Sequence, residues 1–154
     1  RDKYNFPGIR VLQFEFNELP FSEEFDANSV ICTGTHDNDT IVGWFNSLPL
    51  EDDASKSTKG RILEYFKASP DEINWKMIGY GLSRSSDIVI TPIQDILGDD
   101  STARFNTPGT LSDDNWTWRM DEQKLTQSIK SKLAKLTVDN SRVSIELADN
   151  KGES

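Results

Sequence analysis

The sequence predicts an α/β fold built on a small parallel sheet. Three apolar segments of strand-like composition, at residues 9–16, 29–33 and 87–93, alternate with segments of helical spacing. The third is a nearly continuous apolar run, which is typical of a strand covered on both faces, as in parallel sheets. Strands that alternate with helices favour βα units. The 154 residues have room for three such units, whereas a complete (β/α)₈ barrel needs about 250 residues.

The first predicted strand, residues 9–16, follows a Pro-Gly turn and is rich in β-branched and aromatic residues. Its alternation predicts one apolar face formed by Leu12, Phe14 and Phe16. A three-stranded sheet also has two open edges. Because open edges and apolar faces invite pairing with another chain, we expect self-association or low stability of this chain.

The second strand, residues 29–33, is followed by a polar turn at 35–40 and by a short helix that begins near Val42. Residues 50–59 are acidic and rich in serine, which indicates an exposed loop. A further helix is predicted over residues 61–66 from its apolar spacing.

A clear helix start follows at Ser69, which is a plausible N-cap with Pro70 at the first position and Glu72 three residues on. The apolar stripe that comes next predicts a helix to residue 84 or 85, before the third strand.

The last part of the chain is a long polar loop at residues 98–119 and a helix over about residues 121–136. Beyond it the chain is polar except for a weak strand pattern at 143–147. We therefore divide the chain into a structured portion, residues 1–138, and a polar C-terminal tail, residues 139–154.

Charge and composition exclude several classes of protein. The chain has 17 Lys and Arg against 26 Asp and Glu, a net charge of −9, and no basic block, so no nucleic-acid partner is expected. No stretch of about 18 apolar residues exists, which argues against a membrane span. One cysteine, Cys32, rules out a disulfide framework and fits the cytoplasm. The sequence starts with Arg1 and not with Met. If residues precede it in the full protein, they could contain a plastid or other targeting signal.

The densest polar cluster is T-G-T-H-D-N-D-T at residues 33–40, directly after the second strand. The carboxyl end of a parallel strand is where ligands bind in α/β folds. The alternative is an Asx-rich turn in which Asp37 or Asp39 caps the next helix. The D-N-D string resembles the start of a calcium loop but lacks the required Gly and Glu, so no metal and no cofactor are expected.

Two weaker clusters follow. Gln94 and Asp95 come directly after the third strand and suit either a hydroxyl-rich ligand or a turn cap. The loop strings R-F-N-T-P-G, residues 104–109, and N-W-T-W-R, residues 115–119, combine polar groups with two tryptophans. Such loops bind sugars, although the tryptophans would equally pack the loop onto the domain.

Together these stretches resemble the amylomaltase family of 4-α-glucanotransferases, also called disproportionating enzymes. The resemblance covers nearly all of residues 7–120, and it is carried by P-G-I-R-V-L-Q-F at 7–14, T-G-T-H-D-N-D-T at 33–40, P-I-Q-D-I-L at 92–97 and the two loop strings. Their order fits the last third of that family's catalytic domain.

The resemblance implies a partial (β/α)₈ TIM barrel, about its last three βα units, with a long loop and a C-terminal helix. It implies transfer of α-1,4-glucan segments to the 4-hydroxyl of an acceptor sugar by a retaining double displacement. Asp37 would be the transition-state stabiliser, with His36 beside it. The expected substrate-binding residues are Asn106, Asn38, Gln94, Asp95, Arg104 and Trp118.

The sequence also departs from the family. The family's nucleophile and acid/base lie upstream of the P-G-I-R strand, and no glutamate here stands in the acid/base motif. Phe105 stands where the family suggests Met. We therefore expect a fragment that is inactive by itself, whose partners are maltooligosaccharides and the missing N-terminal part of the barrel. The alternatives are a non-catalytic maltooligosaccharide-binding fragment and half of a split barrel.

Overall fold

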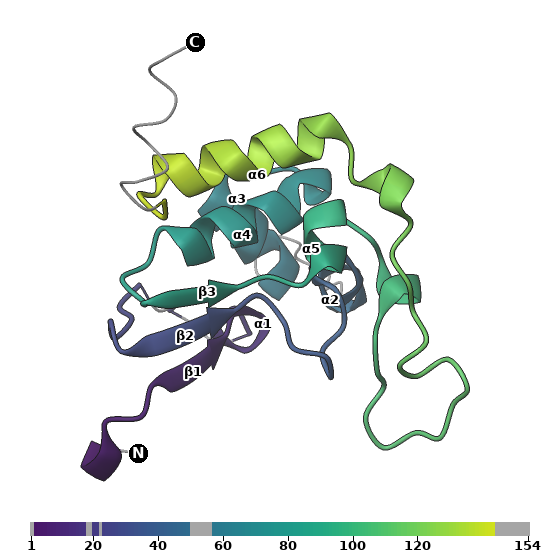
Figure 1. The fold of residues 1–154 in the computed structure, drawn as a ribbon, viewed down its shortest axis with the longest axis horizontal. Coiled ribbons are helices and arrows are strands. Elements are labelled where there is room, and N and C mark those ends of the chain that lie inside the picture. The colour runs from purple at the N-terminus through teal and green to yellow at the C-terminus, as the bar shows by residue number, and fades with distance from the viewer. Residues whose placement is uncertain (1, 18–19, 22, 50–56, 144–154) are drawn as a thin grey trace.

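Three short parallel strands form a sheet against which the helices of the chain pack (Figure 1). The computed structural model describes residues 2–17, 20–21, 23–49 and 57–143. The strands lie in the order β1, β2, β3 and are Gly8–Val11, Ser29–Cys32 and Ile88–Ile90. Both pairings are parallel, which confirms the predicted α/β class.

The helices follow the strands in alternation. Their bounds are α1 (Leu12–Glu15), α2 (Ile41–Ser47), α3 (Thr58–Phe66), α4 (Ile73–Leu82), α5 (Ile93–Leu97) and α6 (Gln127–Asp139). Short 3₁₀ turns lie at Asp2–Tyr4, Pro70–Glu72, Ser101–Ala103 and Glu122–Lys124. No helix in the described part of the chain is long and apolar enough to span a membrane.

One face of the sheet is covered by α4. The close approach depends on Gly81, where a Cβ would already touch Ile31 Cγ2 and Val89 Cγ1 at 3.4 Å. Ile31 on the sheet and Met77 and Ile78 on α4 are at most 1 % exposed. Burial of these apolar side chains is the main stabilising term for this layer.

The opposite face of the sheet is open. The strand register places Ile9, Val30 and Ile88 in one row across the three strands. Ile9 is 67 %, Ile88 50 % and Ile90 51 % exposed. The prediction that the third strand is covered on both faces is therefore wrong for the described residues, because helices pack on one face alone.

The predicted strand over residues 9–16 is wrong in its second half. The strand ends at Val11 and the chain turns directly into α1. Leu12 and Phe16, four residues apart, share a buried helix face at 0 % and 1 % exposure, while Phe14 is 59 % exposed. The predicted apolar strand face is therefore absent, because packing into the core overrides the β propensity of the segment.

The helix start at Ser69 is confirmed. The Ser69 backbone N–H donates to Glu72 Oε2 at 3.1 Å, and the Ser69 hydroxyl donates to the same oxygen at 2.8 Å. A 3₁₀ turn over Pro70–Glu72 then leads into α4, which ends at Leu82, a little before the predicted end. The Arg142 guanidinium donates to the carbonyls of Leu82 and Ser86 at 3.0 and 2.6 Å, so the chain after α6 binds the end of α4.

Three other predicted segments need adjustment. The last helix begins later than predicted, at Gln127, because the Thr126 hydroxyl caps it by accepting the Ile129 N–H. The long loop at 98–119 is confirmed apart from its 3₁₀ turn. Most of the predicted exposed loop at 50–59 and of the predicted strand at 143–147 lies outside the described residues.

The open sheet face generates the first prediction. We expect the 154-residue chain to self-associate through this face, and the double variant Ile9→Lys/Ile88→Lys to be monomeric. Each apolar side chain buried between copies contributes about 1.5–3 kcal/mol, so the loss of two should raise the dissociation constant roughly a hundredfold or more. Sedimentation velocity measures the change.

The control for this experiment is Leu111→Lys, which changes a fully exposed loop residue away from the sheet. Circular dichroism should show the same helix content in all three proteins. A wild-type chain that stays monomeric at high concentration would contradict the prediction.

Candidate active site

The turn between β2 and α2, residues 33–40, carries the polar residues singled out by the sequence. Its shape is set by Asn38, whose Oδ1 accepts the Thr35 backbone N–H at 2.9 Å and the Thr35 hydroxyl at 2.7 Å. His36 and Asp37 lie at the tip, with side chains 58 % and 48 % exposed. The N-cap of α2 is Thr40, whose hydroxyl accepts the Gly43 N–H at 3.0 Å. The alternative in which Asp37 or Asp39 caps this helix is therefore wrong, and both carboxylates serve elsewhere.

Both ends of this turn are held by one buried carboxylate, that of Asp95 on α5. Asp95 Oδ2 accepts the Thr33 hydroxyl at 2.6 Å, and Oδ1 accepts the Ile41 backbone N–H at 2.7 Å. Asp95 is 1 % exposed. Its backbone carbonyl in turn accepts from Asn74 Nδ2 on α4 at 2.8 Å. The turn is thus fixed from the neighbouring βα unit.

Burial raises the pKa of Asp95 to about 6. The hydrogen bonds from Thr33 and Ile41 favour the ionised form and offset part of this effect, while the charge of Asp39 adds to it. The desolvation of a carboxylate inside a protein explains the direction of the shift. Near neutral pH the group is ionised and accepts both hydrogen bonds.

Asp39 connects the turn to two other segments. Its backbone carbonyl accepts from Gln13 Nε2 on α1 at 2.7 Å. Its carboxylate accepts the Thr40 N–H at 2.8 Å and the Ser101 hydroxyl at 2.7 Å. Asp39 therefore supports the turn, since both carboxylate oxygens are used within the protein.

Asp37 is held by the loop that follows α5. Asn106 Nδ2 donates to Asp37 Oδ1 at 2.6 Å, and the Arg104 guanidinium donates to the Asp37 backbone carbonyl at 2.8 Å. The Arg104 Nε also donates to the Asn106 carbonyl at 2.9 Å, which fixes the loop to itself. His36 Nε2 lies 3.4 Å from Asp37 Oδ2. A carboxylate, an imidazole and an amide thus lie together at the surface.

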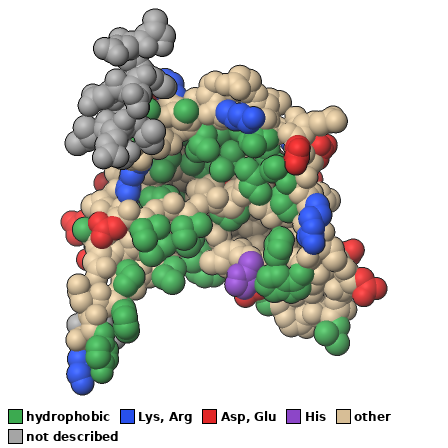
Figure 2. Space-filling model, in the orientation of Figure 1, with side chains coloured by type: hydrophobic (Ala, Val, Ile, Leu, Met, Phe, Trp, Pro, Cys, Tyr) green, Lys and Arg blue, Asp and Glu red, His purple; other side chains and the backbone are tan. Residues whose placement is uncertain are grey.

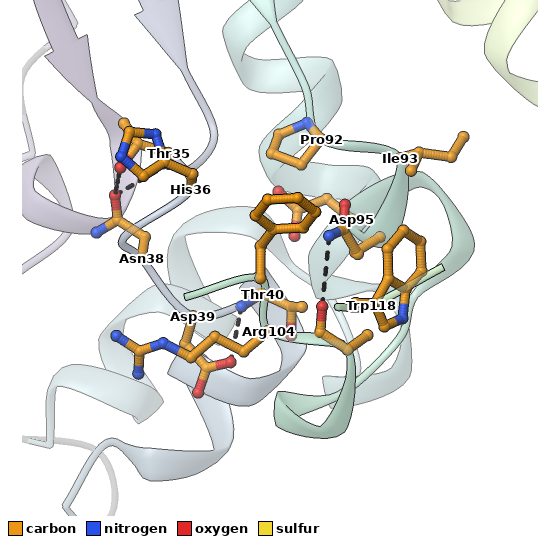
Figure 3. Close-up of a pocket in the computed structure, with 13 residues that line it drawn as sticks. Thr35, His36, Asn38, Asp39, Thr40, Pro92, Ile93, Asp95, Arg104 and Trp118 are labelled. Atoms are coloured by element: carbon orange, nitrogen blue, oxygen red, sulfur yellow. Dashed lines mark hydrogen bonds between the residues drawn. The ribbon is translucent and has the colours of Figure 1, made fainter. Parts of the chain in front are cut away.

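A cavity of about 270 Å³ lies beside this cluster. Figure 3 shows His36 and Asn38 on one side of it and Trp118 on the opposite side. In Figure 2 the histidine lies at the edge of a hollow with hydrophobic side chains next to it. The predicted site residues that line the cavity are His36, Asn38, Gln94, Asp95, Arg104 and Trp118.

The structure therefore brings all eight predicted site residues into one neighbourhood, since Asp37 and Asn106 are bonded to its rim. It also separates them by accessibility. Asp95 and Gln94 are 1 % and 8 % exposed, and Gln94 Nε2 donates to the Ala103 carbonyl at 3.3 Å. Substrate binding by any of the eight stays a prediction.

A larger groove of about 730 Å³ lies between α5 and α6. Its lining is mainly aliphatic, for example Ile96, Leu125 and Leu133, and it lacks the convergent polar groups expected of a catalytic site. Within the described ranges no group of three or more His, Cys, Asp or Glu side chains is placed to hold a metal ion.

The sequence alone assigned no role to three residues of this region. The strand predicted over residues 9–16 would place Gln13 on its polar face, yet Gln13 is 2 % exposed and its Nε2 donates to the Asp39 carbonyl. Thr33 acts through its hydroxyl on Asp95, and Ser101 acts on Asp39. A polar residue inside an otherwise apolar segment was a signal for Gln13. The other two contacts join residues about 62 positions apart, and no local pattern indicates them.

Comparisons with known proteins agree on one family. Residues 1–126 match the model of a family described as 4-alpha-glucanotransferase. The chain is 41 % identical over 143 residues to the 4-alpha-glucanotransferase DPE1 of Oryza sativa subsp. japonica, which covers 88 % of this chain and 23 % of the relative. It is 40 % identical over 144 residues to the 4-alpha-glucanotransferase of Synechocystis sp., or 89 % and 27 % of the two chains.

A solved structure is also similar. Amylomaltase from Streptococcus agalactiae, in complex with acarbose, superposes with a TM-score of 0.82 at 29 % identity over 93 % of this chain and 29 % of that chain. The chain thus spans about a quarter of the length of the relatives it matches.

The buried carboxylate generates a prediction about pH. Since the folded-state pKa of Asp95 lies above its ordinary value of 3.8, the fold favours the protonated acid. Its contribution to the free energy of unfolding is complete below pH 3.8 and is lost as the pH rises to about 6. Asp95→Asn removes this dependence. The wild-type free energy of unfolding should therefore fall by about 2–3 kcal/mol relative to Asp95→Asn between pH 4 and pH 6.5, as measured by urea denaturation. Parallel pH profiles for the two proteins would refute the assignment.

The contact between Asp39 and Ser101 generates a third prediction. A Cβ at position 43 would lie 2.5 Å from Asp39 Oδ1 and would overlap Ser101 Oγ. Gly43→Ala should therefore lower the free energy of unfolding by about 1–3 kcal/mol, although alanine favours the helix. The matched control is Gly79→Ala on α4, where a Cβ would make an ordinary contact with Leu136 at 3.6 Å. That variant should be more stable by about 0.5–1 kcal/mol. Equal effects of the two variants would contradict the argument.

Proposed function

The chain belongs to the 4-alpha-glucanotransferase family, and from this premise we propose that it supplies one side of the active site for transfer of α-1,4-glucan segments. The observation that supports the proposal is the exposed Asp37 carboxylate with His36 and Asn106 beside it at the rim of the cavity. Sugar hydroxyls pair well with such groups, because a carboxylate accepts hydrogen bonds and an amide or imidazole can donate them.

In the proposed reaction a carboxylate attacks the anomeric carbon and a second carboxylic acid protonates the leaving oxygen. The 4-hydroxyl of an acceptor sugar then displaces the enzyme carboxylate and gives its proton to the second group, so the configuration is retained. Asp37 would accept hydrogen bonds from hydroxyls of the reacting sugar, with His36 at the same ring. Bonds that strengthen as the ring flattens lower the barrier, because they stabilise the transition state more than the bound substrate.

We assign the nucleophile and the acid/base to residues outside this chain. A retaining pair must lie about 5–5.5 Å apart across the scissile bond. The other two carboxylates of the cavity already accept hydrogen bonds within the protein. Asp39 accepts them from Thr40 and Ser101. Asp95 accepts them from Thr33 and Ile41. This leaves Asp37 as the carboxylate of the cavity region with an exposed side chain.

The same proposal accounts for the fold. We interpret the three parallel βα units as the end of a (β/α)₈ barrel, with residues 1–138 as the catalytic portion. The site lies where the chain leaves β2 and β3, and this carboxyl end carries active sites in such barrels. The open face with Ile9 and Ile88 would then pack inside the completed barrel.

Among the remaining site residues, Arg104 and Asn106 would set the position of Asp37, and Trp118 would offer an aromatic face to a sugar ring. Asn38 and Asp95 would act mainly by holding the turn. The partners are maltooligosaccharides together with the missing barrel portion or a second copy. The cytoplasm is the predicted compartment, with a plastid as the alternative because the rice relative is named chloroplastic or amyloplastic.

The test measures binding and turnover separately. Maltotriose is titrated into the chain by calorimetry, and its products are followed by chromatography. We expect binding without glucose release. Asp37→Ala should weaken binding roughly 10- to 100-fold, because hydrogen bonds to a charged group are lost. The control is Asp71→Ala, which removes an exposed carboxylate in the 3₁₀ turn before α4.

Two results would overturn parts of this proposal. Glucose together with longer maltooligosaccharides would place a carboxylate pair within the chain. Equal affinity of the wild type and Asp37→Ala for maltotriose would remove Asp37 from the binding site. Because the similar amylomaltase structure contains acarbose, acarbose is a second ligand for the same titration.

A further inference from the structure

Trp116 has an unusual backbone conformation next to the candidate site. Its φ of 68° lies in the left-handed region, which a bulky L-residue rarely adopts. The residue is 52 % exposed, so burial of its side chain in a core does not explain the conformation. Outliers of this kind persist where surrounding contacts enforce them, and they cluster at functional sites.

The contacts of Trp116 explain what enforces the conformation. Its backbone N–H donates to the Phe105 carbonyl at 2.8 Å. Its ring meets the Phe105 ring edge-to-face, with centroids 5.2 Å apart and an interplanar angle of 89°. Phe105 lies between Arg104 and Asn106, the two residues that bind Asp37. Trp116 is therefore fixed to the same segment of the loop that fixes Asp37.

The Trp116 ring also lies against the histidine of the turn. The His36 and Trp116 ring centroids are 5.2 Å apart and the planes are inclined by 38°. The His36 side chain is 58 % exposed, and Asp37 Oδ2 lies 3.4 Å from its Nε2. An exposed imidazole with one such neighbour has several accessible rotamers, and an aromatic ring along its side removes some of them.

We propose that Trp116 is a positioning residue that holds the His36 imidazole in the orientation that binds a sugar hydroxyl. The proposal rests on the proposed function, which assigns His36 to the reacting sugar. The loop then holds both polar side chains at the tip of the turn, since Asn106 fixes Asp37 and Trp116 fixes His36. The left-handed backbone at Trp116 is what brings its ring to His36 while Phe105 supports it.

The experiment uses the fact that His36 is the only histidine of the chain, so its ring protons give unambiguous NMR signals. Trp116→Gly removes the ring and suits a positive φ, Trp116→Phe keeps an aromatic ring, and Leu111→Gly is the control in the same loop. Maltotriose affinity is measured for each protein, and the amide spectrum reports whether the fold is kept.

We expect the His36 signals of the wild type to be displaced by the ring current of Trp116 and to lose this displacement in Trp116→Gly. Maltotriose binding should weaken about fivefold in that variant, the loss expected for one misaligned hydrogen bond. Trp116→Phe should restore most of the affinity, and Leu111→Gly should match the wild type. The amide signals of α4 and the sheet should stay in place in all variants.

His36 signals in Trp116→Gly that match those of the wild type would overturn the proposal. A variant that loses the ring-current displacement but keeps full maltotriose affinity would also overturn it. If the wild-type chain bound no maltotriose, the proposed function would fail. The His36 signals would still decide the contact with Trp116, so the two failures are distinguishable.

Discussion

The candidate site depends on one buried carboxylate, that of Asp95, which accepts hydrogen bonds from the Thr33 hydroxyl and the Ile41 N–H. These donors lie at the two ends of the turn that carries His36 and Asp37. A carboxylate that is 1 % exposed is costly to bury, and hydrogen bonds to both oxygens offset that cost. The same bonds fix the spacing between the end of β2 and the start of α2. The buried Asp95 carboxylate therefore determines where the exposed side chains of His36 and Asp37 lie.

A second layer of contacts closes the site from the loop after α5. Ser101 binds the Asp39 carboxylate, Arg104 binds the Asp37 carbonyl, and Asn106 binds the Asp37 carboxylate. Each contact joins residues more than 60 positions apart in the chain. The loop has no regular structure of its own apart from a 3₁₀ turn, so its order comes from these contacts. Preorganised groups of this kind need little rearrangement when a ligand binds.

Local signals in the sequence predicted what local interactions determine. The strand at 29–33, the helix start at Ser69 and the polar turn at 35–40 are confirmed because caps and short-range patterns decide them. The prediction of a strand at residues 12–16 is wrong. The composition of this segment favours a strand, but burial of Leu12 and Phe16 on one helix face decides its structure.

The candidate site divides in the same way. Its members were predicted from motif strings, and the structure brings them together around one cavity. The sequence does not predict which of these residues hold the turn in place and which are exposed to a ligand, because this depends on burial and on distant hydrogen-bond partners. Asp95 and Asp37 are both aspartates that follow a strand, yet one is buried against two donors and the other has a side chain that is 48 % exposed.

Under the proposed function, the exposed isoleucines and the carboxylates that are already hydrogen-bonded within the protein would have a common explanation. The open sheet face exposes Ile9, Ile88 and Ile90 to solvent, which is unfavourable for apolar side chains on neighbouring strands. At the carboxyl edge of the same sheet, Asp39 and Asp95 bind within the protein, and a retaining reaction needs two further carboxyl groups. Additional strands that extend the sheet from its edges and close it around that face would bury the isoleucines, and their carboxyl ends would lie opposite Asp37. One structural element would thus satisfy both the packing of the sheet and the chemistry of the proposed transfer.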